Sequence, residues 1–186
     1  LIMKTTNSGE DWQFQFVSLY ENKFNSVKFI SPNTGFIAGG KMSEPYSGMI
    51  YKTVNGGDSW YPVYPNSADI GFRSISFPSK DTGYVVGGYE FGSSGVIYKT
   101  INGGEFWNQI GIVNKDLNSV QFLTNATGYT VGEGGTILKT TDGSTVWTSQ
   151  VSTTLNDLNS VCFLHPDLGY TAGNSGSVQK TLNGGV

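Results

Sequence analysis

Apolar and polar positions alternate over short stretches throughout the chain, and these stretches are separated by glycine, asparagine, aspartate and serine. In Asn118–Leu123, for example, Val120 and Phe122 occupy alternate positions. Short alternating runs bounded by such residues predict β-strands joined by hairpins. No window of ten or more residues keeps apolar side chains at the i, i+3, i+4, i+7 spacing of an amphipathic helix. The pattern therefore predicts an all-β protein.

The strands recur together with an eight-residue phrase, Thr-x-Asn/Asp-x-Gly-x-x-Trp, whose copies begin 40 to 48 residues apart. The recurring residues are Thr5, Asn7, Gly9 and Trp12; Thr53, Asn55, Gly57 and Trp60; Thr100, Asn102, Gly104 and Trp107; and Thr140, Asp142 and Trp147. A fifth copy starts at Thr181. This period is typical of propeller blades and of helical repeats of the HEAT kind. Because the local pattern is that of strands, it favours blades.

Each repeat is predicted to form four antiparallel strands, and such units arranged around an axis make a β-propeller. An elongated stack of the same sheets is the alternative. The predicted blades of this single propeller or propeller segment, 1–186, are approximately 1–17 (partial), 25–65, 72–112, 117–151 and 158–186 (partial). The chain would open and stop in a third strand, which gives 2 + 12 + 3 = 17 strands, whereas four closed blades need 16. We therefore expect about four blades as an arc of a larger propeller, with closure at four as the less favoured arrangement.

The recurring phrase resembles the Asp-box of bacterial neuraminidase repeats, which implies a turn between the third and fourth strands of a blade. An Asn or Asp side chain can bond the backbone two residues on, glycine supplies positive φ, and tryptophan packs a large ring between neighbouring sheets. We therefore interpret the box residues as structural. The fourth copy has Ser144 where glycine is expected, and its turn is expected to be looser or of another type.

A longer consensus surrounds the box, with Gly-x-Ile-x-Lys-Thr before it and Ser-Val-x-Phe after it. It looks like the photosystem II stability/assembly-factor family of propellers, and the resemblance covers essentially the whole chain. Members that act in photosystem assembly use a patch of arginines, whereas this sequence has Arg73 alone. This difference argues against a photosynthetic role for the segment.

The charge pattern narrows the classes of partner. The chain has 11 Lys and Arg against 14 Asp and Glu, a net charge of −3, and its basic residues do not cluster along the sequence. This argues against binding to nucleic acid or to an anionic membrane surface. No apolar stretch approaches the ~20 residues of a transmembrane helix. Few charges and many Asn, Ser, Thr and Tyr are typical of an exported protein, so a secreted, periplasmic or cell-surface location is expected.

Catalytic chemistry has few candidates in this sequence. A sialidase-like site holds its substrate carboxylate with three arginines, and only Arg73 is present. A glycosidase needs paired carboxylates, for which Glu90, Glu133 and Asp116 are conceivable, although nothing places two of them at catalytic separation. The lone histidine, His165, has no companion ligand for a metal. We therefore expect no enzyme activity, cofactor or metal within this chain.

The copies differ in the connection from the second strand to the third. Gly132 to Thr140 spans eight residues, whereas Gly39 to Thr53 spans 14 and Gly87 to Thr100 spans 13. Insertions of this kind map to loops on one face of a repeat array, often the binding face. We expect them to share that face with the interblade connection 61–65, opposite the boxes.

Exposed aromatic side chains rimmed by polar groups anchor proteins and also stack on sugars. The predicted partner-binding residues are Lys41, Glu44, Tyr46, Tyr64, Tyr89, Glu90 and Phe91. The sequence thus predicts a non-catalytic protein-binding or assembly module whose partner is a protein or a larger assembly. A carbohydrate-binding or glycoside-hydrolase-like propeller with a glycan partner is one alternative. The others are an architectural element of a surface or extracellular assembly, and loop expansions without a role.

Overall fold

The computed structural model describes residues 1–16, 22–41, 46–89 and 94–185, and within these ranges the paired strands are antiparallel. They form sheets of two, four, four, four and three strands, which confirms the predicted all-β fold and its series of strands. We call β1–β2 the N-terminal hairpin, β3–β6 blade 1, β7–β10 blade 2, β11–β14 blade 3 and β15–β17 blade 4.

The N-terminal hairpin and blade 1 comprise β1 (Ile2–Lys4), β2 (Gln13–Phe16), β3 (Asn22–Phe29), β4 (Gly35–Lys41), β5 (Ser47–Thr53) and β6 (Tyr61–Ala68). Blade 2 comprises β7 (Ile70–Ser76), β8 (Gly83–Tyr89), β9 (Gly95–Thr100) and β10 (Asn108–Val113). Blade 3 comprises β11 (Leu117–Phe122), β12 (Gly128–Gly132), β13 (Ile137–Thr140) and β14 (Thr148–Ser149). Blade 4 comprises β15 (Leu158–Phe163), β16 (Gly169–Gly173) and β17 (Val178–Thr181). Two 3-10 turns, η1 (Glu133–Gly135) and η2 (Asn174–Gly176), connect the second and third strands of blades 3 and 4.

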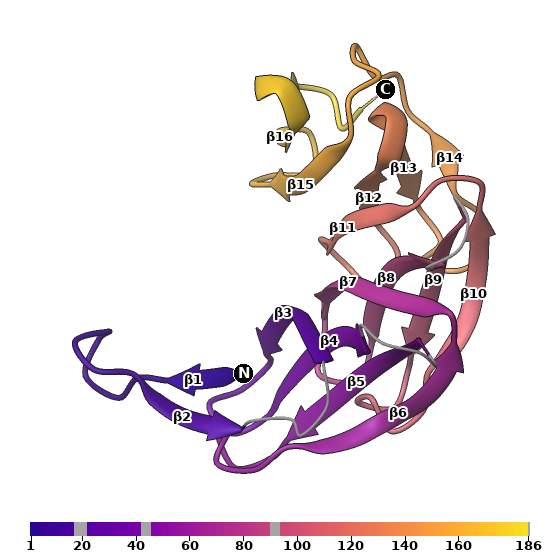
Figure 1. The fold of residues 1–186 in the computed structure, drawn as a ribbon. Coiled ribbons are helices and arrows are strands. Elements are labelled where there is room, and N and C mark those ends of the chain that lie inside the picture. The colour runs from indigo at the N-terminus through magenta and orange to yellow at the C-terminus, as the bar shows by residue number, and fades with distance from the viewer. Residues whose placement is uncertain (17–21, 42–45, 90–93, 186) are drawn as a thin grey trace.

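The sheets follow one another along an arc (Figure 1). The first strand of each blade lies on the concave side, and the last strands of blades 1 to 3 lie on the convex side. This radial order is that of a propeller and differs from a flat stack of sheets.

Aromatic rings join each blade to the next. The aromatic residue that follows the first glycine of the second strand stacks on a phenylalanine of the following blade, which is the last residue of the first strand or the residue directly after it. The pairs are Phe36 with Phe77 (4.3 Å between ring centroids), Tyr84 with Phe122 (3.4 Å) and Tyr129 with Phe163 (3.8 Å). Such pairs contribute about 0.5–1.5 kcal/mol beyond the area that they bury. The core of the protein therefore lies largely at the joints between blades.

Serine hydroxyls accept hydrogen bonds from the backbone of the first strands, which face the concave side. Among the described strands, none pairs with a first strand on that side, so its N–H groups need other acceptors. The Ile75 N–H donates to Ser26 Oγ of the preceding blade (3.3 Å), and the Val120 N–H donates to Ser74 Oγ (3.2 Å). The Val161 N–H donates to Ser119 Oγ in the same way (3.3 Å). The Ser of the recurring Ser-Val-x-Phe phrase thus has a defined structural role.

The lysine before each box threonine holds the box turn of the next blade. Lys52 Nζ donates to the Gly103 carbonyl (2.8 Å), Lys99 Nζ to the Gly143 carbonyl (2.7 Å) and Lys139 Nζ to the Gly184 carbonyl (2.9 Å). A hydrogen bond from a charged donor contributes roughly 1.5–3 kcal/mol. The lysine of each of these Lys-Thr dipeptides therefore links its own blade to the box turn of the next blade.

One predicted connection is wrong. Residues 61–65 lie within β6, the fourth strand of blade 1, where Tyr64 pairs with Ile50 and Tyr61 with Lys52. The segment contains Pro62, and among the strands that the structure describes β6 pairs with β5 alone. An outer strand tolerates proline because the ladder on its free side needs no N–H donor.

Candidate binding face

The box turns are built around the threonine hydroxyl. In blade 1, Thr53 Oγ1 accepts from the Gly57 N–H (2.9 Å) and donates to Asn55 Oδ1 (2.9 Å). Asn55 Oδ1 also accepts from the Ser59 N–H (3.0 Å), which lies four residues on and not two as expected. The box asparagine therefore spans the whole turn. With its polar atoms engaged in this way, the box forms part of the scaffold.

The fourth box has a different geometry, as the serine in place of glycine predicts. Asp142 Oδ1 accepts from the Ser144 N–H only two residues on (2.9 Å). Thr140 Oγ1 accepts from the Gly143 N–H (3.1 Å), one residue earlier than in the other boxes. These short-range bonds hold the pKa of Asp142 below its usual value, first through the Ser144 N–H and then through the Thr140 hydroxyl.

The box tryptophans pack to different extents. Trp60 and Trp107 are buried, with 8% and 7% of their surface exposed. Trp107 contacts the rings of Phe77 in its own blade (5.8 Å) and Phe36 in the preceding blade (6.5 Å), which is the expected position between sheets. Trp12 in the N-terminal hairpin is 55% exposed.

The two long connections begin at one place on the molecule. A polar hollow of about 210 Å³ lies at the joint of blades 1 and 2. Its lining residues are Lys23, Asn25, Gly40, Lys41, Gly71, Arg73 and Gly88. Lys41 is the last residue of β4 and Gly88 the penultimate residue of β8, so both second-to-third-strand connections leave from the rim of this hollow. We call this side of blades 1 and 2 the loop face.

The predicted partner-binding residues differ in their surroundings. Tyr46 is half-buried, and its carbonyl accepts from the Asp69 N–H (3.0 Å). Tyr64 and Tyr89 are also half-buried and pack against the core of blades 1 and 2. The ring of Tyr64 meets the rings of Phe72 (5.6 Å) and Tyr98 (5.4 Å), so this side chain mainly supports the core. Glu44, Glu90 and Phe91 lie outside the described residues.

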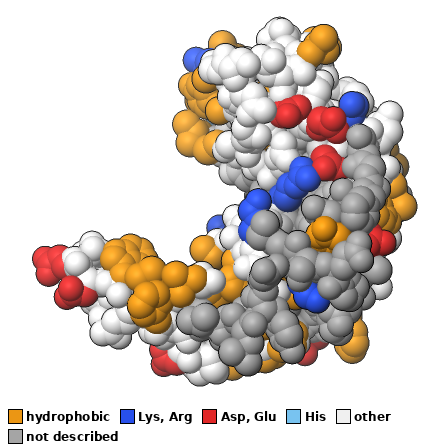
Figure 2. Space-filling model, in the orientation of Figure 1, with side chains coloured by type: hydrophobic (Ala, Val, Ile, Leu, Met, Phe, Trp, Pro, Cys, Tyr) orange, Lys and Arg blue, Asp and Glu red, His pale blue; other side chains and the backbone are white. Residues whose placement is uncertain are grey.

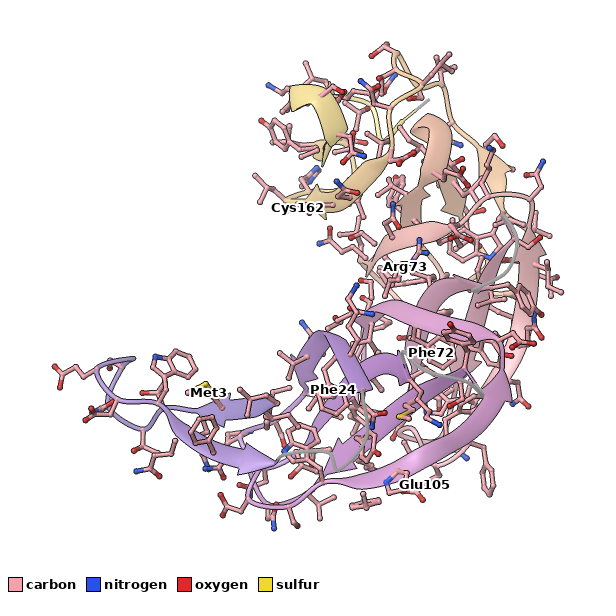
Figure 3. The ribbon with its side chains drawn as sticks, in the orientation of Figure 1. Met3, Phe24, Phe72, Arg73, Glu105 and Cys162 are labelled. Atoms are coloured by element: carbon pink, nitrogen blue, oxygen red, sulfur yellow. The ribbon has the colours of Figure 1, made fainter. Side chains whose placement is uncertain are left out.

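Basic residues that look scattered in the sequence gather in space, contrary to the sequence-based expectation. Lys23, Lys41 and Arg73 line the same hollow, and Figure 2 shows Lys and Arg side chains together near the middle of the arc. Arg73 Nη2 donates to Asp116 Oδ2 (2.6 Å) and Arg73 Nη1 to Asn118 Oδ1 (2.7 Å) across the joint with blade 3. Figure 3 shows Arg73 beside β11 of that blade. Sequence analysis missed Lys23 as a site residue because its role depends on the pairing of Lys23 with Gly40.

Two of the three carboxylates considered for catalysis pair with cations, and the third, Glu90, lies outside the described residues. Asp116 pairs with Arg73, and Glu133 Oε1 lies 3.8 Å from Lys115 Nζ. His165 is an exposed turn residue with Nδ1 3.7 Å from Asp167 Oδ2. Within the described ranges, no group of three His, Cys, Asp or Glu could hold a metal ion. No helix among these residues is long and apolar enough to cross a membrane.

Radially arranged four-stranded sheets, box turns and interblade lysines define the protein as part of an Asp-box β-propeller. Residues 3–154 match the family model described as photosynthesis system II assembly factor YCF48, and the chain belongs to this family. The sequence-based resemblance is thereby confirmed. No curated protein matches the sequence.

Several solved structures share the fold. YCF48 bound to a D1 peptide is 18% identical with a TM-score of 0.63, over 87% of this chain and 54% of that one. YCF48 from Cyanidioschyzon merolae is 18% identical with a TM-score of 0.60, over 88% and 57% of the two chains. The GH74 xyloglucanase from Xanthomonas campestris is 12% identical with a TM-score of 0.74, over 98% and 33%. At these identities the likeness shows the fold alone, and the chain spans about half the length of the YCF48 structures.

Proposed function

We propose that the chain is a non-catalytic protein-binding module of an assembly factor and that its loop face binds the partner. The observation that carries the proposal is that both long connections leave from one hollow at the joint of blades 1 and 2. Repeat arrays use such unequal loops for recognition, whereas the shared turns maintain the scaffold. Membership in the YCF48 family supports an assembly role, and the structure of YCF48 with a D1 peptide supports a peptide segment as the ligand.

The state of the acidic residues favours binding over glycoside hydrolysis. The two catalytic groups of a glycosidase are carboxyl groups that flank the glycosidic bond, whereas the described candidates here lie against basic side chains. Asp116 Oδ2 lies 2.6 Å from Arg73 Nη2, and Glu133 is paired with Lys115. These carboxylates suit structural ion pairs better than proton transfer.

An exported location is also part of the proposal. Its support is the composition, with 13% charged residues and many Asn, Ser, Thr and Tyr. Fractionation of the native host, with the chain detected by antibody, tests this point. Recovery in the cytoplasmic fraction alone would reject it.

Site-specific photo-crosslinking tests the binding face. The D1 peptide and peptides selected from a phage-displayed library would serve as ligands, with affinities measured by fluorescence anisotropy. A photoreactive amino acid replaces Tyr46 on the loop face or, as the matched control, Phe106, a 71% exposed residue of the second box. We expect crosslinks from position 46 and only background from position 106. Binders that crosslink only at position 106, or no enriched peptide at all, would refute the proposal.

A further inference from the structure

One position at the start of each blade differs in a systematic way. The residue before the first-strand Phe or Leu is Lys23, Gly71, Asp116 or Asp157 in blades 1 to 4. The pairing between the first and second strands shows that these four residues occupy the same position in their blades. Lys23 pairs with Gly40 and Gly71 with Gly88, while the Asp116 and Asp157 carbonyls accept from the N–H groups that follow Gly132 and Gly173 (2.9 and 2.8 Å).

The two aspartates at this position face the preceding blade. Asp157 Oδ1 accepts from the Gly134 N–H of blade 3 (2.9 Å), which holds the short connection between the second and third strands of that blade. Asp116 Oδ2 accepts from Arg73 of blade 2 (2.6 Å). Each of these two joints therefore contains a carboxylate that bonds a donor on the preceding blade.

The joint of blades 1 and 2 lacks this carboxylate because its residue is Gly71. The hollow of about 210 Å³ lies there, and its side-chain donors are those of Lys23, Asn25, Lys41 and Arg73. Lys23 is exposed, and its ammonium group makes no hydrogen bond or ion pair with the residues that the structure describes. Lys23 and Lys41 thus line a hollow at the joint where the equivalent residue carries no carboxylate.

We infer that this hollow binds a carboxylate group of a ligand in the place of the missing aspartate. An ionised carboxylate only accepts hydrogen bonds, and lysine and asparagine supply donors at the rim. The carboxylate could belong to a bound peptide, as an acidic side chain or a C-terminus, or to a free small acid. For the peptide source, the inference rests on the proposed function and specifies the chemistry of the partner.

Titration of the folded 186-residue chain tests the inference. The first probe is acetate. The others, used at equal ionic strength, are a peptide selected from the phage-displayed library with a free C-terminus, the same peptide with an amidated C-terminus, and the same peptide with Asp replaced by Asn.

Two variants of the chain alter the hollow. Gly71→Asp supplies the internal carboxylate that blades 3 and 4 have at this position, and Lys23→Met removes one ammonium group. Both variants should lose at least about tenfold in affinity, as loss of a hydrogen bond to a charged group predicts. Lys23→Arg should restore binding, and Lys115→Met, which alters a lysine paired with Glu133, should leave it unchanged.

The pattern of losses identifies the source of the carboxylate. A weaker amide indicates the C-terminus, a weaker Asn peptide indicates the side chain, and saturable acetate binding that both variants weaken indicates a free acid. Each of these results supports the inference. Equal affinity in the parent, Gly71→Asp and Lys23→Met overturns it, as does the absence of any difference between acidic and neutral peptides. If crosslinking from position 46 persists at unchanged affinity in Gly71→Asp, the proposed function stands and the carboxylate site is rejected.

Discussion

The ring of Tyr84 lies parallel to the ring of Phe122, with 3.4 Å between centroids and 4° between planes. The Tyr84 hydroxyl lies 2.8 Å from the Asn125 carbonyl and 2.9 Å from the Gly143 carbonyl, both in blade 3. One side chain of blade 2 therefore contacts the first strand of blade 3, the turn after it and the box turn. Since Tyr84 is fully buried, the joint depends on both its ring and its hydroxyl.

Substitution of Tyr84 should separate these two contributions. Tyr84→Phe keeps the ring but removes the donor of the Asn125 carbonyl and one of the two donors of the Gly143 carbonyl, which retains Lys99 Nζ. This change should lower the free energy of unfolding by about 1–3 kcal/mol. Tyr84→Ala also creates a cavity and should cost about 3–5 kcal/mol. Urea unfolding measures both. The control is Tyr170→Phe, at the equivalent but 36% exposed position of blade 4, and a Tyr84→Phe variant as stable as the parent would contradict the role of the hydroxyl.

The same hydroxyl predicts a loss of stability in alkali. Burial, with a smaller contribution from the charge of Asp142, raises the pKa of Tyr84 from 10.0 to about 12. The folded state therefore holds this proton more tightly than the unfolded state. Its contribution is complete below pH 10 and is lost as the pH rises from about 10 to 12. The difference in unfolding free energy between the parent and Tyr84→Phe should shrink over this range, and a constant difference would contradict the prediction.

Gly143 should tolerate alanine much less well than Gly176, although both have positive φ (60° and 70°). A Cβ at Gly143 would lie 2.1 Å from the Asn125 carbonyl oxygen and 2.6 Å from the Tyr84 hydroxyl, whereas one at Gly176 meets nothing within 4 Å. Gly176→Ala should cost only the left-handed conformation, about 1–2 kcal/mol. Gly143→Ala must in addition displace backbone and should cost clearly more. Thermal unfolding compares the two, and equal losses would show that the clash is relieved.

The fourth box should confer sensitivity to acid. The pKa of Asp142 is lowered, first by the Ser144 N–H and then by the Thr140 hydroxyl. A lowered pKa in the folded state stabilises the protein above the unfolded pKa of 3.8, and this stabilisation is lost as the pH falls below that value. Asp142→Asn restores the asparagine of the other boxes and should flatten the stability profile below pH 4. If the free energy of unfolding of Asp142→Asn falls below pH 4 as steeply as that of the parent, other carboxylates determine the acid sensitivity.

Much of the fold could be predicted because each repeat carries its own local signals. The Thr-x-Asn-x-Gly-x-x-Trp turns and the alternating first strands define the blades without any long-range information. A fourth strand in blade 1 was predicted, but its position at 61–65 was not, because prolines such as Pro62 are typical of connections. Only the place of β6 at the outside of blade 1 makes Pro62 compatible with a strand. The hollow was missed for another reason. Lys23 and Gly71 lie 48 positions apart in the sequence, and only the joint between two blades brings them together.

The serine hydroxyls on the concave side have a consequence for how such proteins change in size. Ser26, Ser74 and Ser119 each make the same bond to the blade that follows. A duplicated repeat would therefore arrive with matching contacts for both of its neighbours. Evolution can lengthen or shorten the array by whole units through recombination, while the variable loops diverge independently of the shared framework.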